Sequence, residues 1–511
     1  MFFVLVAVLS TAHPRGYFVA SLNRTKSIDL LMKDSGADGE SALKRTLGAW
    51  SLVGLGIGAI IGAGLFVRTA AAIAERAGPS VTLAFMVAGI GCAFAGLCYA
   101  EFASMIPIAG SAYTYSYATM GEFVAWIIGW DLVLEYAVGA ATVAIAWSQY
   151  FNKLLTIFGS SPIPYQWSHS PFETMTGTGV HGIMNIPAVL ILLVLSLVLV
   201  RGTQESALLN GIIVITKVAI VMMVIGIGWG FMNPANHTPY IPAATTYTTK
   251  LGVTHAYGGI MGVLGAAGVV FFAFIGFDAV STAAQEAKNP ARDMPIGILG
   301  SLVVCTILYV LFAHVLSGVA TVDDFRGAGG EASVSFAIEK YMIGYGWLAN
   351  LVTVAILAGF SSVILVMLLG QSRVFYSMSR DGLVPKVFSD THPKYRTPYK
   401  SNMLFFFFTA AFAGFLPDSI VGEMTSIGTL FAFILVCIGV LILRVRRPEL
   451  PRSFRVPAIW VVSTSGVIVC GAMIYGLGKD TWIRLVVWLA IGLLFYFGYG
   501  RKHSALEKGN R

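Results

Sequence analysis

The chain has 511 residues, of which 57% are hydrophobic and 11% are charged, and its mean hydropathy is +0.78. Soluble globular proteins carry about 25% charged residues, so this composition excludes a soluble protein and predicts a polytopic membrane protein. The net charge of +8 could suggest a nucleic acid partner. The basic residues lie mostly in the loops of one side, however, so we expect a lipid bilayer as partner and no nucleic acid.

Twelve apolar segments follow one another along the chain, and most reach the length of about 20 residues that crosses a bilayer. The segments are 46–73, 80–106, 118–150, 183–200, 208–232, 258–283, 297–319, 347–371, 402–416, 424–443, 459–477 and 482–500.

The basic residues indicate the orientation of these segments. If the N-terminus is inside, 24 Lys and Arg residues fall in the inner loops and tails, and 7 fall in the outer loops. By the positive-inside rule, this asymmetry predicts an integral protein of the plasma (inner) membrane with both termini in the cytoplasm. The tails are then residues 1–45 and 501–511. The apolar start MFFVLVAVLS could be mistaken for a signal peptide, but it lacks the basic region of one. We therefore interpret it as part of the cytoplasmic tail.

The first segment carries an unusual density of glycine. Gly54 and Gly58 have the GxxxG spacing of close helix packing. Gly62-Ala63-Gly64 is better explained by unwinding in mid-membrane, which is tolerated only where the backbone lines a cavity. Gly54-x-Gly56 could alternatively begin the G-x-G-x-x-G motif that binds dinucleotides. This motif follows a β-strand, however, and here no strand is expected before it and its third glycine is not at the required position. We therefore expect a binding site at this break.

The sixth segment contains a second interruption, where Gly276 is followed by Asp278 at bilayer depth. Two broken helices in equivalent places predict an inverted repeat, the plan of a secondary transporter. The repeats are then 46–232 and 258–443. Free N–H groups at the first break would hold a carboxylate, and carbonyls of the second would accept from an ammonium. This pair of charges describes an α-amino acid.

Ionisable residues inside the segments are expensive in lipid and must face the protein interior. They are Glu101, Asp131, Glu135, Lys217 and Asp278. Lys217 lies near the midplane and could gain and lose a proton during transport. The alternative is a fixed ion pair with Asp278 or Glu135. Asp131 and Glu135 share a helix face and could suggest a carboxylate pair for acid/base catalysis. An intramembrane aspartyl protease is disfavoured, because the sequence around Asp278 lacks the GxGD pattern of such enzymes. Arg68 is expected to extend toward the outer surface, and a contact with an anionic group of the substrate is the alternative.

At this point the sequence resembles a known family, the amino acid–polyamine–organocation superfamily, and within it the cationic amino acid transporter group with its bacterial homologues. The resemblance covers roughly residues 40–450. It rests on GIGAIIGAGLF (56–66), YAEFASMIPIAGSAYTYSYATMGEF (99–123), FFAFIGFDAVSTAAQEAKNPARDMPIGI (271–298), SRVFYSMSRDGLVP (372–385) and TSIGTLFAFILVCIGVLILR (425–444).

The resemblance implies an all-α membrane protein of 12 transmembrane helices, with a 5+5 inverted-repeat (LeuT-like) fold and two further helices within 459–500. It also implies that Lys217 occupies the place of sodium in sodium-coupled relatives, which favours proton coupling. Ser361 and Ser362 match the hydroxyls of that sodium site, so Lys217 is expected to reach toward them and toward the carbonyls near Gly58. Relatives often carry Ser or Thr where this chain has Ala63, so a hydroxyl contact to the substrate is missing.

We therefore expect a secondary active transporter of L-amino acids, not an enzyme, coupled to protons and selective for neutral or a broad range of side chains. Transport or exchange of cationic amino acids or polyamines is the alternative, and a channel or an intramembrane enzyme is disfavoured. Neither a cofactor nor a metal is expected, and the sequence gives no indication of a small single-helix accessory subunit. The expected substrate-binding residues are Ile60, Ile61, Gly62, Ala63, Gly64, Phe272, Ala273, Ile275 and Phe360. The expected proton-coupling residues are Lys217, Glu135, Asp278, Ser361 and Ser362.

Overall fold

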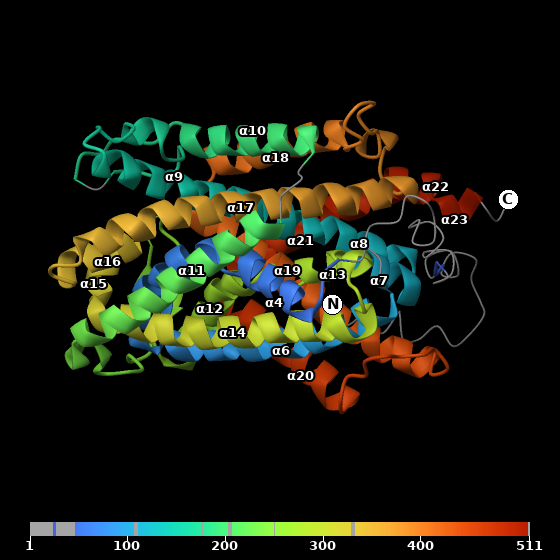
Figure 1. Ribbon diagram of the computed structural model, residues 1–511, viewed down its shortest axis with the longest axis horizontal. Coiled ribbons are helices and arrows are strands. Elements are labelled where there is room, and N and C mark those ends of the chain that lie inside the picture. The colour runs from blue at the N-terminus through green and yellow to red at the C-terminus, as the bar shows by residue number, and fades with distance from the viewer. Residues whose placement is uncertain are drawn as a thin grey trace.

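The computed structural model describes residues 24–26, 46–106, 111–175, 177–202, 207–249, 251–328 and 333–508, which form a bundle of long helices running roughly in one direction (Figure 1). The helices of the bundle are α4 (Ala49–Ile60), α5 (Thr69–Ala72), α6 (Val81–Met105), α8 (Glu122–Val133), α9 (Gly139–Ile157), α10 (Ile186–Arg201), α11 (Ala207–Gly228), α12 (Gly259–Val270), α13 (Ala279–Thr282), α14 (Pro290–Val319), α17 (Gly346–Arg380), α18 (Tyr399–Phe415), α19 (Asp418–Arg446), α20 (Ile459–Leu477) and α21 (Lys479–Phe495).

The described part of the chain holds eight helical stretches that are long and apolar enough to cross a membrane. Three shorter apolar helices, α4, α10 and the stretch Gly259–Phe274, accompany them. The protein is therefore a mostly helical integral membrane protein.

Small residues allow α14 to approach both α6 and α4. A Cβ atom at Gly96 of α6 would lie 2.6 Å from the Leu302 side chain, and one at Gly56 of α4 would lie 2.5 Å from Ser301 Oγ. Without a hydrophobic driving force between helices in lipid, such close backbone approach supplies the packing contacts. This interface holds the first broken helix in place.

The helical stretches are interrupted at the two positions where the glycine pattern predicts breaks. The helix α4 ends at Ile60, and helical turns resume as the π-helix Gly64–Arg68. The helix α12 continues as the 3₁₀-helix Phe271–Phe274 and then stops. Gly276 follows with a φ of +116°, a conformation that favours glycine. A further π-helix, Leu134–Val138, lies between α8 and α9 and contains Glu135.

One end of the bundle carries a β-hairpin, which corrects the expectation of an all-α protein. The strands β1 (Thr245–Thr248) and β2 (Thr254–Tyr257) pair antiparallel between α11 and α12. Their β-branched and aromatic residues favour strands, a signal that the search for apolar segments passes over. The short helices α15 (Val322–Ala328) and α16 (Ser333–Tyr341) lie at the same end (Figure 1), where the Arg326 guanidinium stacks on the ring of Tyr247 at 4.6 Å.

The opposite end of the bundle carries α7 (Ser111–Thr119), α22 (Arg501–His503) and α23 (Ala505–Lys508) (Figure 1). The expected C-terminal tail 501–511 is therefore helical as far as Lys508, and its last three residues lie outside the described residues. Of the expected tail 1–45, the structure describes residues 24–26. Lys26 is buried, and its Nζ lies 2.8 Å from Oδ1 of Asp381.

Candidate functional site

The two breaks lie against each other in the middle of the bundle. A Cβ atom at Gly64 would lie 2.1 Å from Cα of Ala273, and one at Gly276 would lie 2.8 Å from the Ala59 carbonyl oxygen. Because both neighbours are backbone, neither position accepts a side chain without moving a helix. The fold thus brings together the two stretches of backbone expected to bind substrate, Ile60–Gly64 in the first break and Phe272, Ala273 and Ile275 in the second.

A third helix joins the two breaks through one hydroxyl group. Tyr309 of α14 is fully buried, and its hydroxyl oxygen lies 2.9 Å from the Ile60 carbonyl oxygen and 3.0 Å from the Ala273 carbonyl oxygen. A phenol has one proton, so it donates to one of these carbonyls at a time. The sequence reasoning missed Tyr309, because an aromatic residue in an apolar helix gives no local signal of a polar contact.

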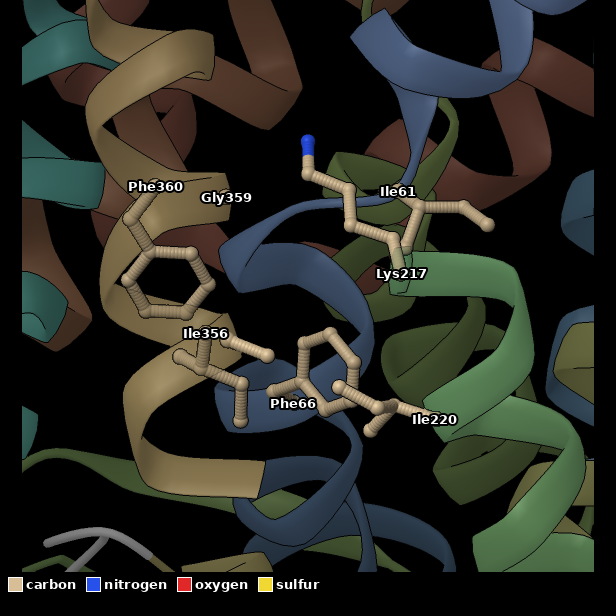
Figure 2. Close-up of a pocket in the computed structure, with 8 residues that line it drawn as sticks. Ile61, Phe66, Lys217, Ile220, Ile356, Gly359 and Phe360 are labelled. Carbon is tan, nitrogen blue, oxygen red and sulfur yellow. The ribbon is translucent and has the colours of Figure 1, made fainter. Parts of the chain in front are cut away.

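Aromatic side chains fill the space beside the first break. Phe66 lies 6.5 Å from Phe360 and 5.7 Å from Phe312, measured between ring centroids. Figure 2 shows the Phe66, Ile356 and Phe360 side chains gathered beside the unwound segment, with Lys217 extending toward it from α11. The cavity among them has a volume of about 10 Å³, which is room for about one water molecule. An amino acid enters only if these side chains move.

The Lys217 side chain ties α11 to the first broken helix. Its Nζ donates to the Gly58 carbonyl oxygen at 2.9 Å, and its exposed fraction is 4%. A Cβ atom at Gly359 of α17 would lie 2.6 Å from Lys217 Cε, so this glycine makes room for the lysine. The contact with the carbonyl of Gly58 agrees with the expectation from the resemblance.

The hydroxyl of Ser361 has other partners. It donates to the Leu357 carbonyl oxygen at 2.9 Å and accepts from Nε1 of Trp147 at 3.1 Å. This indole, on α9, was not anticipated from the sequence. Ser361 therefore joins α17 to α9 in this structure, and among the described residues the Lys217 ammonium donates only to the Gly58 carbonyl oxygen.

The acidic residues of the interior form a separate group. Glu135 and Asp278 are fully buried, and their carboxyl groups lie close to each other. Tyr136 donates to Oδ2 of Asp278 at 2.6 Å. Among the described residues, Lys217 forms no ion pair with either acid. The fixed ion pair considered from the sequence is therefore not formed in this conformation.

Arg68 covers the site from the hairpin end, which corrects the expectation that it extends to the outer surface. Its exposed fraction is 4%. Its Nη1 lies 3.2 Å from Oδ2 of Asp418, and its Nη2 donates to the Asp418 carbonyl oxygen at 2.6 Å. The guanidinium also lies 5.7 Å from the ring centroid of Phe272. Asp418 is 350 residues away in sequence, so no local pattern could indicate this pair.

At the opposite end, two acidic residues hold the tails of the chain. Asp381 accepts from Lys26 at 2.8 Å and from the Tyr113 hydroxyl at 2.7 Å. Glu122 accepts from the Ser504 hydroxyl at 2.5 Å and from the Tyr496 hydroxyl at 3.1 Å. These contacts fix the described parts of both tails to the bundle at the end opposite the hairpin.

Comparisons with known proteins show the family of the chain. A family model described as amino acid permease matches residues 47–495. The chain is 42% identical to the branched-chain amino acid permease BcaP of Bacillus subtilis, over 96% of this chain and 99% of the relative. It is 39% identical to a methylthioribose transporter of the same organism, over 96% of this chain and 100% of the relative. It is also 33% identical to the vacuolar cationic amino acid transporter 4 of Arabidopsis thaliana, over 84% of this chain and 68% of the relative.

Proposed function

This chain belongs to the amino acid permease family, and from that premise we propose that it is a secondary active transporter that moves neutral L-amino acids into the cell together with protons. The observation that carries the proposal is the meeting of two broken helices beside an apolar wall. The Ile61 N–H still donates to the Ile57 carbonyl oxygen, so the unwound backbone offers the N–H groups of Gly62, Ala63 and Gly64 to a carboxylate, and the Phe272, Ala273 and Ile275 carbonyls offer acceptors to an ammonium.

The chemistry of the wall supports a neutral, aliphatic substrate. Seven of the eight residues that line the central cavity are uncharged and without polar side-chain atoms, and the eighth is Lys217. A cationic side chain in this space would face the lysine without a carboxylate to balance it, at an electrostatic cost. The name of the Bacillus subtilis relative, a branched-chain amino acid permease, favours the same substrate class. The name of the Arabidopsis relative, a cationic amino acid transporter, supports cationic amino acids as the alternative.

The proposed coupling uses groups that can carry a proton between the two repeats. Lys217 contacts a carbonyl of the first broken helix, so a change in its charge would alter how α4 is held. Glu135 and Asp278 are fully buried and lie close to each other, an arrangement that is favourable only when a proton or a cation lies between them. Ser361 and Ser362 follow Gly359 on the same helix and complete the proposed coupling region.

The proposed architecture has twelve spans, with repeats 46–232 and 258–443 and two further spans within 459–500. The hairpin, α15 and α16 would then face the outside, and α7, α22 and α23 would face the cytoplasm. Support comes from the distribution of basic residues and from the equivalent places of the two breaks. On this orientation, the Arg68 pair covers the site on its outer side, and the Asp381 contacts lie at the cytoplasmic end of the bundle.

Uptake by purified protein in proteoliposomes tests the proposed function. Labelled leucine should enter with saturable kinetics, be competed by valine but not by arginine, and be recovered unmodified. Accumulation should follow an inward proton gradient and be indifferent to sodium. If arginine competes with leucine better than valine does, the substrate is a cationic amino acid. If only methylthioribose competes, amino acids are not the substrate. If uptake depends on sodium, the transporter is not coupled to protons.

A further inference from the structure

The C-terminal segment of the chain contacts the same residue that holds the described part of the N-terminal tail. Asp381 directly follows α17, and its carboxylate accepts from Lys26 Nζ at 2.8 Å and from the Tyr113 hydroxyl at 2.7 Å. Its backbone carbonyl oxygen accepts from the Ala505 N–H at 2.9 Å. One residue therefore joins both tails, since its side chain binds one tail and its backbone binds the other.

The backbone beside Asp381 has a shape that receives the C-terminal segment. Gly382 has a φ of +79°, which favours glycine, and a Cβ atom there would lie 2.2 Å from the His503 carbonyl oxygen. The Ser504 side chain is buried, and its hydroxyl donates to Oε2 of Glu122 at 2.5 Å. The segment thus fixes the position of Asp381 relative to Glu122, the first residue of α8.

The described N-terminal residues connect three helices at the end of the bundle where α7, α22 and α23 lie (Figure 1). The Lys26 N–H donates to the Tyr117 carbonyl oxygen of α7 at 3.1 Å, and the Lys26 ammonium binds Asp381 at the end of α17. The Arg24 carbonyl oxygen accepts from the Glu122 N–H of α8 at 2.9 Å. A transporter with alternating access opens at each end in turn, and this connection opposes opening at this end.

Few contacts attach the C-terminal segment, so it can detach while the bundle stays folded. Among the described side chains between Arg501 and Leu506, only that of Ser504 is buried. The helices α22 and α23 have three and four residues. Segments with few buried apolar contacts open locally at low free energy. Detachment removes the Ala505 donor from the Asp381 carbonyl oxygen and frees the backbone that positions the carboxylate.

We propose that the C-terminal segment 501–506 regulates the attachment of the N-terminal residues 24–26. While the segment is bound, Asp381 is held in place for Lys26, and the connection among α7, α8 and α17 opposes opening. When the segment detaches, the ion pair loosens and this end opens more readily, so release of substrate into the cytoplasm is favoured. The proposal rests on the proposed orientation, which puts this end at the cytoplasm, and it is independent of which amino acid is carried.

Hydrogen–deuterium exchange of the purified full-length chain, measured by mass spectrometry, tests this proposal without a transport assay. The Lys26 N–H is bound to the Tyr117 carbonyl oxygen, so its exchange reports how often residues 24–26 detach. Ala505→Pro removes the N–H that Asp381 accepts, and proline suits the first position of a helix, where Ala505 lies. We expect exchange at position 26 to become about five-fold faster, the effect of losing one hydrogen bond, while exchange in α14 stays unchanged.

The matched control is Ala505→Gly, which removes a methyl group but keeps the N–H. Exchange at position 26 should then stay at the wild-type rate. Ser504→Ala loosens the same segment from Glu122 and should also speed this exchange. In a Lys26→Gln background, where the ion pair is already lost, Ala505→Pro should add no further increase, because the segment acts through Asp381.

Three results would overturn the proposal. The first is wild-type exchange at position 26 in both the Ala505→Pro and Ser504→Ala proteins. The second is a further increase caused by Ala505→Pro in the Lys26→Gln background, which would mean that the segment acts independently of the ion pair. The third is faster exchange throughout α14, which would show general destabilisation. Because no substrate is added, a failure of the uptake experiment would leave this test unaffected.

Discussion

A Cβ atom at Gly64 would lie 2.1 Å from Cα of Ala273, so the two broken helices meet backbone against backbone. Even one methyl group at this position must separate them. We expect Gly64→Ala to lose substrate-induced thermal stabilisation and most of the uptake. The matched control is Gly54→Ala in α4, before the break, where a Cβ atom meets nothing within 4 Å. That variant should be neutral or gain up to about 1 kcal/mol of stability. Equal behaviour of the two variants would contradict the proposed site.

The Tyr309 hydroxyl should contribute to stability through the two carbonyls that it bridges. Tyr309→Phe leaves the Ile60 and Ala273 carbonyl oxygens without this donor, and a lost partner of a buried polar group costs about 1–3 kcal/mol. We expect a lower thermal midpoint than that of Tyr475→Phe, which removes a hydroxyl from a ring that is 66% exposed. A midpoint as high as that of the Tyr475 variant would mean that the bridge carries no stability.

The breaks show how far the sequence could predict this site. Glycine at positions 62, 64 and 276 indicated the breaks, because glycine lowers helix stability and is retained where the structure needs it. The contact between Lys217 and Gly58 followed from the resemblance. The Tyr309 bridge did not, because it depends on how α14 crosses both breaks. The hairpin was missed because its two strands are only four residues long and mostly polar, so they show no alternation of apolar residues.

Lys217 should be required for accumulation driven by protons. Lys217→Ala removes the ammonium that holds the Gly58 carbonyl, so we expect loss of uptake against a gradient, while exchange of internal for external leucine is retained. Gly359→Ala should reproduce part of this defect, because its Cβ would lie 2.6 Å from Lys217 Cε. Gly471→Ala, where a Cβ meets nothing within 4 Å, is the control. A Lys217→Ala protein that still concentrates leucine on a pH gradient would reduce the lysine to a structural role.

The pair of Arg68 and Asp418 should control access from outside. Asp418→Asn weakens the ion pair that holds the guanidinium beside Phe272, so this ring should become easier to reach. In a Phe272→Cys background, we expect a membrane-impermeant thiol reagent to react faster when Asp418→Asn is added. The five native cysteines are all buried, and the unmodified parent measures their background reaction. An unchanged rate would show that Arg68 does not limit access.

The hairpin histidine predicts part of the pH dependence of stability. Burial, together with the nearby Arg76 guanidinium, lowers the pKa of His255 from 6.5 to about 4. The unfolded chain therefore binds a proton at His255 more readily than the folded protein between about pH 6.5 and pH 4. Stability should fall across this window as the pH is lowered. We expect His255→Gln to reduce the fall in thermal midpoint between pH 7 and pH 4.5, relative to the wild type. His181→Gln, at an exposed position, should leave the fall unchanged, and an equal fall in all three proteins would show that His255 is not the group responsible.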